Sequence, residues 1–191
     1  MYQKYTTEAF IVSTRVSGEN DRLFLIYTRE FGMIMAHATS VRASKSKLRP
    51  HLNIGVLLTL TLLKSKIRWT LTEATESTEK IYVRSLEYKV FAKILLALKS
   101  LIHGEEKNES LFEVLLSFYN FLLEKHDDEK LISGAECLTM VQILNALGYG
   151  KSETDILQVK NDFTDENLLL INQNRKELVK EINRALGETG F

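Results

Sequence analysis

The stretch RLFLIYTREFGMIMAHAT, residues 22–39, decides the fold of the first half of this chain. Residues 22–29 and 33–39 are rich in aromatic and branched apolar side chains, which favour strands. Between them, Glu30-Phe31-Gly32 supplies a tight turn, because Gly32 can adopt a positive φ at no steric cost. The stretch therefore predicts a β-hairpin.

Three more strands are expected around this hairpin. Residues 7–15 precede it, separated by a turn cluster at 17–21. Residues 52–63 and 67–73 follow it and are joined by a turn at 64–66. Five short strands with antiparallel turns predict a small closed barrel of the OB (oligonucleotide-binding) type, with a five-stranded open sheet as the alternative.

The apolar period becomes helical after residue 79, as the spacing of Leu86, Val90 and Ile94 illustrates. The pattern predicts helices over residues 81–102, 111–125, 131–147 and 175–186, whereas the polar residues 150–166 are expected to be irregular. Ser110 is the expected N-cap of the second helix, and Gly148 is expected to end the third. The predicted fold class is α+β, with an N-terminal five-stranded OB-type β-barrel in residues 1–80 and a C-terminal α-helical domain in residues 81–191.

The net charge of zero conceals a difference between the two halves. Residues 1–84 carry 13 Lys and Arg against 7 Asp and Glu, a net +6, whereas residues 85–191 carry 12 against 18, a net −6. A local positive excess attracts phosphate backbones. The first half is therefore a candidate for binding a polyanion, although chance segregation on a solvated surface is the alternative.

The basic residues of the first half gather at two turns. Segment 42–49 holds four cations separated by Ser and small residues, which suits a phosphate-binding loop beside a barrel. A second basic turn occupies residues 64–68. In an OB barrel the loops and the exposed sheet face bind nucleic acid, so the candidate DNA-binding residues are Arg42, Lys45, Lys47, Arg49, Lys64, Lys66 and Arg68. Tyr27 and Trp69 are candidates for stacking bases, although a single Trp in a small barrel is more often core.

The sequence offers no catalytic, metal or cofactor site. The four His residues are scattered, Cys137 is the one cysteine, and nucleotide-binding glycine motifs are absent. The run His126-Asp127-Asp128-Glu129 is better explained as a charged turn than as a metal site. The N-terminus lacks the apolar region of a signal peptide, and no apolar stretch approaches the ~20 residues of a membrane span. We therefore expect a non-enzymatic cytoplasmic protein without cofactor or membrane contact.

The first half resembles the RecO family of recombination mediators. The resemblance runs through TEAFIV at 7–12, GENDRL at 18–23, YTREFG at 27–32 and VRASKSKL at 41–48, with LGY far downstream at 147–149. It adds Arg22 to the candidate DNA-binding residues. It implies an OB barrel and a helical domain that bind single- and double-stranded DNA, anneal complementary strands and act with RecR to load RecA onto DNA covered by single-strand-binding protein.

Two departures from the family pattern qualify this expectation. Many members carry paired zinc-binding cysteines after LGY, but residues 151–163 contain none. Some members capture the acidic tail of single-strand-binding protein on a basic helix before LGY, but no Lys or Arg lies between Lys130 and Lys151. The resulting hypothesis is a DNA-binding recombination mediator. The alternatives are a protein-interaction adaptor whose barrel does not bind DNA directly and, less favoured, an enzyme with an unrecognised site.

Overall fold

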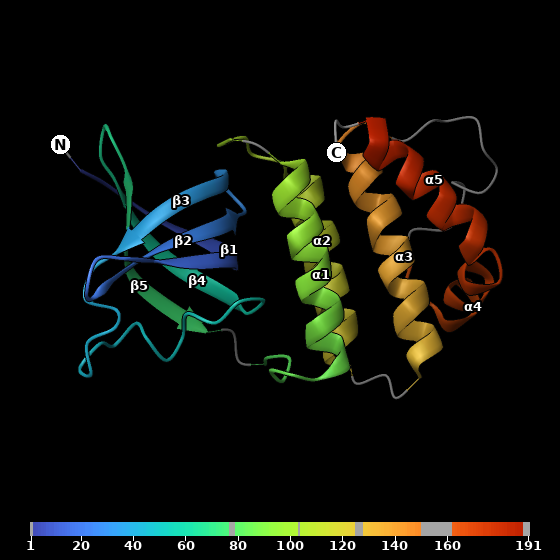
Figure 1. Ribbon diagram of the computed structural model, residues 1–191, viewed down its shortest axis with the longest axis horizontal. Helices are drawn as coiled ribbons and strands as arrows, with labels where there is room; N and C mark the ends of the chain where they lie inside the picture. The colour runs from blue at the N-terminus through green and yellow to red at the C-terminus, as the bar shows by residue number, and fades with distance from the viewer. Residues whose placement is uncertain (1, 77–78, 103, 125–127, 150–161, 189–191) are drawn as a thin grey trace. The chain divides into compact units, whose positions relative to one another are not determined.

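The computed structural model describes residues 2–76, 79–102, 104–124, 128–149 and 162–188 (Figure 1). The chain divides into two compact units. One comprises residues 1–88 and 95–109, and the other comprises residues 89–94 and 110–191. The first unit contains all five strands.

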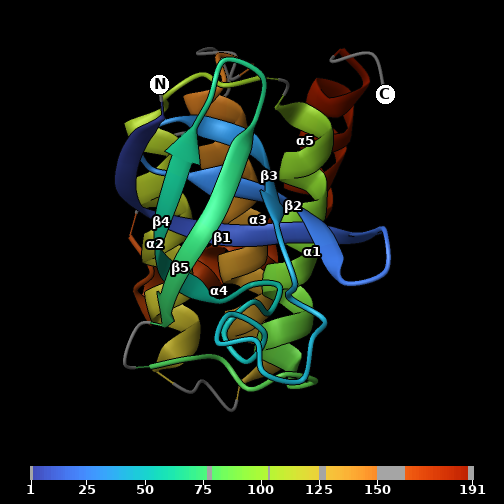
Figure 2. The ribbon, with the colours of Figure 1, turned by 90° about the vertical axis from the view of Figure 1, so that its left-hand side faces the viewer.

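The strands form a closed barrel (Figures 1 and 2). In chain order they are β1 (Gln3–Ser17), β2 (Asp21–Thr28), β3 (Gly32–Ala38), β4 (Leu57–Lys64) and β5 (Trp69–Glu76). Their order around the barrel is β1-β2-β3-β5-β4, and β1 pairs with β4 to complete the ring. The closed ring confirms the predicted barrel and excludes the open sheet.

Strand β1 serves two neighbours because it is long and bent. Its first half pairs with β4 and its second half with β2, and the register with β2 shifts at Val12. Such a bulge bends a strand and increases its twist, which helps a sheet to close. All these pairings are antiparallel, whereas β3 and β5 meet in a short parallel contact at Ala36–Trp69 and His37–Thr70.

Alternate side chains fill the barrel, as the period of two requires. Phe24 and Ile26 of β2 point inward and are completely buried, together with Ile34 of β3. Gly32, at the start of β3, has a φ of +65°, and a Cβ atom there would lie 2.1 Å from the carbonyl oxygen of Glu106. Both its conformation and this close approach require glycine.

The helices are α1 (Leu86–Leu101), α2 (Glu109–Leu123), α3 (Glu129–Ala146), α4 (Asp165–Gln173) and α5 (Arg175–Glu188). In the second unit, Phe91 contacts the ring of Tyr119 edge-on at 5.3 Å, and α3 packs against α4 and α5. None of the described helices is long and apolar enough to cross a membrane.

Three predictions about the helices were wrong. Helix α1 begins at Leu86 rather than residue 81, because residues 79–84 are not helical and Ser85 caps the helix. Ser110 is not an N-cap, because α2 already includes Glu109. The irregular segment predicted over 150–166 overlaps α4, which begins at Asp165; residues 150–161 lie outside the described part of the chain. Gly148 does follow α3, with a positive φ of +82°.

Candidate nucleic-acid interface

Three arginines line one cleft of the barrel unit. Arg22, Arg42 and Arg49 surround a space of about 440 Å³, whose floor includes Phe24 and Leu52. Arg22 is the second residue of strand β2, and the other two arginines come from the loop between β3 and β4. The structure therefore brings together residues that lie up to 27 positions apart in the chain.

The loop that supplies Arg42 and Arg49 is anchored on the barrel. Val41, Leu52 and Val56 are buried in the barrel core, and Leu48 packs against the same core. The predicted loop is present, and part of it packs against the barrel core. Apolar anchors at intervals hold the loop down, while the cations between them remain exposed.

Arg42 is fixed by hydrogen bonds to the β1–β2 turn. Its backbone N–H donates to the carbonyl oxygen of Asn20 (2.9 Å), and its Nη1 donates to that of Glu19 (2.8 Å). A guanidinium has five N–H donors, so most of those of Arg42 remain available to a ligand. This side chain is positioned for binding rather than free to move.

Arg22 carries a buried donor without a partner. Its Nε is shielded from solvent and has no hydrogen-bond partner among the described residues. Leaving a buried donor unpaired costs about 1–3 kcal/mol. An anion in the cleft would relieve the repulsion among the three guanidinium groups.

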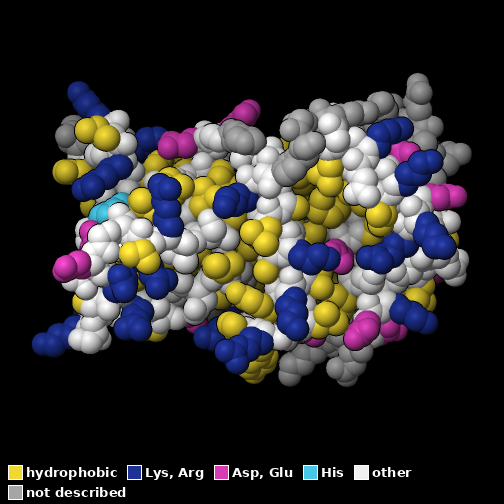
Figure 3. Space-filling view, viewed as in Figure 1, with side chains coloured by type: hydrophobic (Ala, Val, Ile, Leu, Met, Phe, Trp, Pro, Cys, Tyr) yellow, Lys and Arg dark blue, Asp and Glu magenta, His cyan; other side chains and the backbone are white. Residues whose placement is uncertain are grey.

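Lys45 and Lys47 lie outside this cleft. Both are exposed on the loop, and neither pairs with a carboxylate within the described ranges. Figure 3 shows Lys and Arg side chains gathered over the loop that follows β3, at the lower left of the view. These lysines extend the positive surface beyond the three arginines.

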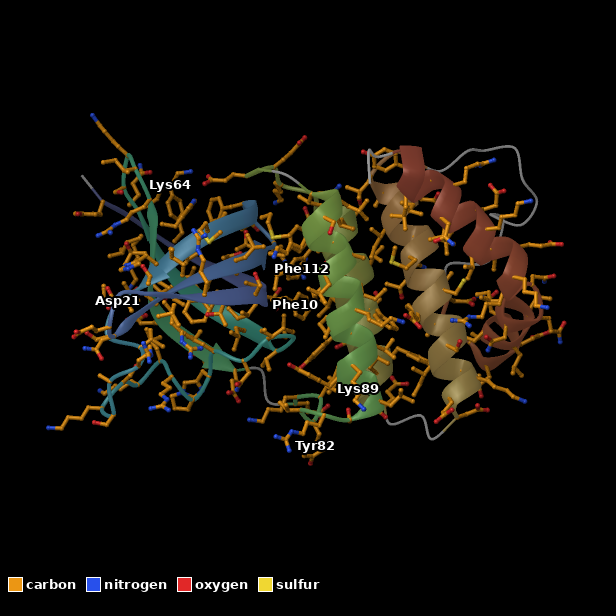
Figure 4. The ribbon with its side chains drawn as sticks, viewed as in Figure 1. Phe10, Asp21, Lys64, Tyr82, Lys89 and Phe112 are labelled. Atoms are coloured by element: carbon orange, nitrogen blue, oxygen red, sulfur yellow. The ribbon has the colours of Figure 1, made fainter. Side chains whose placement is uncertain are left out.

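The second basic turn lines a different cleft, of about 530 Å³. Lys64, labelled in Figure 4, is neutralised there by Glu105, whose Oε2 lies 2.9 Å from the Lys64 Nζ. Lys64 also lies 4.5 Å from the centre of the Trp69 ring. Lys66 and Arg68 are exposed without a carboxylate partner among the described residues, so two cations of this turn remain available.

Glu105 connects this turn to the barrel core. Its Oε1 accepts a hydrogen bond from the Trp69 Nε1 at 2.8 Å. Burial acts to raise the pKa of Glu105, but the hydrogen bonds from Lys64 and Trp69 leave that pKa below its ordinary value. The carboxylate is therefore charged at neutral pH and offsets the charge of Lys64.

Tyr27 and Trp69 do not present rings to solvent, so the prediction that they stack bases is not supported. Tyr27 is completely buried on the outer face of the barrel, and its hydroxyl donates to the carbonyl oxygen of Asn108 at 3.3 Å. Trp69 is 2% exposed and packs in the barrel core. Stacking needs an open ring face, which neither residue offers.

Cys137 is buried, and burial raises the pKa of its thiol. Among the described residues, no group of His, Cys, Asp and Glu is placed to hold a metal ion. Within the run 126–129, Asp128 caps α3 by accepting from the Lys130 N–H at 2.7 Å, while residues 126 and 127 lie outside the described ranges.

Comparison with known proteins agrees with this architecture. The family model for the N-terminal part of recombination protein O matches residues 1–76. DNA repair protein RecO of Dehalococcoides mccartyi is 32% identical over 59% of this chain and 46% of the relative. DNA repair protein RecO of Desulfitobacterium hafniense is 29% identical over 76% of this chain and 52% of the relative.

The match covers the barrel completely, but the chain spans only about half the length of these curated relatives. The strands within residues 1–76 are the ones that build the closed barrel and carry the arginine cleft. From the barrel and these matches, we conclude that residues 1–76 form a domain of the kind found at the N-terminus of recombination protein O.

Proposed function

We propose that this protein binds DNA through its barrel and acts in recombinational repair in the cytoplasm. The arginine cleft, formed by Arg22, Arg42 and Arg49, would hold phosphates of the backbone. Lys45 and Lys47 would contact neighbouring phosphates, with Lys66 and Arg68 as a second contact region. The relatives are named DNA repair protein RecO, which supports this direction.

The observation that carries the proposal is the convergence of three arginines, from β2 and from the loop after β3, on one cleft. Arginine binds phosphate through two parallel hydrogen bonds, and charge-assisted bonds are about twice as strong as neutral ones. Phosphate contacts position DNA without reading its sequence. We therefore expect binding to be independent of sequence and strongly dependent on salt.

The proposed roles in strand annealing and RecA loading rest on the family resemblance. Neutralising the phosphates of two strands reduces their mutual repulsion, so complementary strands can pair on the basic surface. We propose on this basis that the protein anneals single strands. Together with RecR, it would help RecA load onto DNA covered by single-strand-binding protein.

Fluorescence anisotropy with a labelled single-stranded oligonucleotide, measured at several salt concentrations, tests the proposal. The variant Arg22→Ala/Arg42→Ala/Arg49→Ala is expected to bind weakly. Its slope of log affinity against log salt should flatten by about 2, since each single-strand phosphate contact contributes about 0.7. Urea unfolding followed by Trp69 fluorescence checks that the variant remains folded.

A matched control removes the same number of charges elsewhere. Lys99, Lys176 and Lys180 are exposed on α1 and α5 and have no carboxylate partner among the described residues. Their combined replacement by Ala should leave most of the affinity intact. Unchanged binding by the folded arginine variant would contradict the assignment of the site.

One observation favours the alternative of a protein-interaction adaptor. Ile67 is 93% exposed at the tip of the β4–β5 turn, and Met35, which is 42% exposed, lines the same cleft. Exposed apolar groups of this kind suit a protein partner. An adaptor would show no salt-dependent DNA binding at all, so the same anisotropy series separates the two functions.

A further inference from the structure

Tyr82 is an exposed aromatic side chain of the barrel unit. It is 73% exposed and lies in the segment between β5 and α1, at the bottom of the view in Figure 4. Of the described aromatic residues, only Tyr2 and Tyr82 are this open to solvent. Residues 81–85 were predicted to belong to a helix, and Tyr82 was therefore not recognised from the sequence as an exposed ring.

The segment around Tyr82 is held in one conformation. Ile81 is 6% exposed and anchors it, while the Ser85 N–H donates to the Tyr82 carbonyl oxygen at 3.1 Å. The Ser85 hydroxyl in turn accepts from the Tyr88 N–H at 3.1 Å and caps α1. The Tyr82 ring is therefore presented from an ordered turn, which lowers the entropy cost of binding.

Arg84 has a conformation that costs energy. Its φ is +78°, a left-handed value that non-glycine residues rarely adopt. Strain of this kind persists where the surrounding structure enforces it, and it concentrates at functional positions. Here it places an exposed guanidinium two residues from the exposed ring.

Glu76 contacts both this segment and the basic loop. Glu76 Oε2 lies 2.9 Å from the Nζ of Lys80, and Glu76 Oε1 lies 3.3 Å from the Nδ1 of His51. His51 follows Arg49 by two residues, and Lys80 precedes Tyr82 by two. His51 and Lys80 therefore meet at one carboxylate, which brings the segment of Tyr82 beside the loop that supplies Arg49.

We propose that Tyr82 stacks on an unpaired base of the strand whose phosphates occupy the arginine cleft. This inference rests on the proposed function and extends it. The cleft offers charge but no open ring face, since Tyr27 and Trp69 are buried. Tyr82 supplies the ring and Arg84 a further phosphate contact, the combination that single-strand binding proteins use.

Base stacking distinguishes single strands from duplexes. Bases in a duplex are already stacked on their neighbours and are not available to a side chain, whereas those of a single strand are. Tyr82 would therefore add affinity for single strands only, while the cations bind both forms. The protein would prefer unpaired DNA and release its stacked base once a complementary strand pairs.

The test compares the wild-type chain with Tyr82→Ala, Tyr82→Phe and Tyr2→Ala by fluorescence anisotropy. The probes are labelled oligothymidylate, an oligonucleotide of equal length that is abasic throughout, and a duplex. Tyr82→Ala should bind oligothymidylate about 5- to 150-fold more weakly, the range for one stacked base. It should bind the abasic strand and the duplex like the wild type.

The control variants retain binding. Tyr82→Phe keeps the ring and should match the wild type on every probe, as should Tyr2→Ala, which removes an equally exposed tyrosine. Unchanged affinity of Tyr82→Ala for oligothymidylate would overturn the proposal, as would an equal loss on the abasic strand. If the wild type itself binds none of the probes, the proposed function fails and not this inference alone.

Discussion

Replacing Arg22 by Met is expected to stabilise the free protein while weakening its binding to DNA. Arg22 carries a buried Nε without a hydrogen-bond partner among the described residues, in a cleft shared with Arg42 and Arg49. Met retains the length and apolar packing of the side chain stem. The substitution removes both the unpaired donor and one of three like charges.

The expected magnitudes follow from this geometry. An unsatisfied buried donor costs about 1–3 kcal/mol. Because Arg22 is only half-buried, we expect a gain near the lower limit, about 1 kcal/mol in the free energy of unfolding. A hydrogen bond to a charged group contributes about 1.5–3 kcal/mol, so DNA affinity should fall by about 10- to 100-fold.

Urea unfolding measures the first effect, with the fluorescence of Trp69, the only tryptophan, as the probe. Anisotropy with labelled oligothymidylate measures the second. Arg42→Met is the matched comparison, because it also removes the hydrogen bond to the Glu19 carbonyl and should therefore destabilise the protein. If Arg22→Met lowers the free energy of unfolding, the reasoning about the unpaired donor is refuted.

Three further perturbations test other parts of the structure. Gly32→Ala should destabilise by more than about 1 kcal/mol, because the φ of +65° and the carbonyl of Glu106 both oppose a Cβ; urea unfolding measures this. Glu105→Gln should remove an acid-dependent part of the stability. The pKa of Glu105 is lowered in the folded protein, so its contribution is complete above the ordinary value of 4.5 and is lost as the pH falls through the folded-state pKa. Stability curves of the two proteins that remain parallel between pH 6 and about 3 would contradict this. Arg84→Gly should raise the free energy of unfolding by relieving the left-handed strain yet weaken binding to oligothymidylate, and a loss of stability would argue against strain at this position.

The strands of the barrel could be predicted because runs of aromatic and branched apolar residues mark them. Such runs located β1 to β3 within a few residues, and Phe24 and Ile26 lie in the core. Tyr27 follows Ile26 in the same strand and therefore lies on the opposite face. The sequence pattern of a strand does not show whether both of its faces are covered. Tyr27 is buried because the outer face of β2 is covered as well.

Errors at element ends came from residues that depend on distant contacts. Strand β4 begins at Leu57 rather than at residue 52, because Leu52 and Val56 anchor the preceding loop on the barrel core. Helix α4 was missed because it buries few side chains, chiefly Leu168 and Ile171, and so lacks a clear apolar stripe. Local patterns do not record such contacts.

The charges of the candidate site were visible in the sequence, but their grouping was not. Segment 42–49 was recognised from composition, yet only the folded chain places Arg22 in the same cleft as Arg42. Lys64 was counted as a DNA-binding cation, although Glu105, which follows it by 41 positions, offsets its charge. Tertiary pairing therefore decides which cations remain available.

The short parallel contact between β3 and β5 has a consequence for the motion of the barrel. The ring closes there at only Ala36–Trp69 and His37–Thr70, whereas the other strand pairs continue over seven or more register positions. The contact joins residues more than 30 positions apart, so it gains little to offset its loop-closure entropy. This seam should be the last part of the barrel to form and the first to open, with its amide protons exchanging well before those of β1 and β2. Trp69 lies at this contact, so its fluorescence would report each opening. The barrel that supports the arginine cleft therefore has one strand pair that separates before the others.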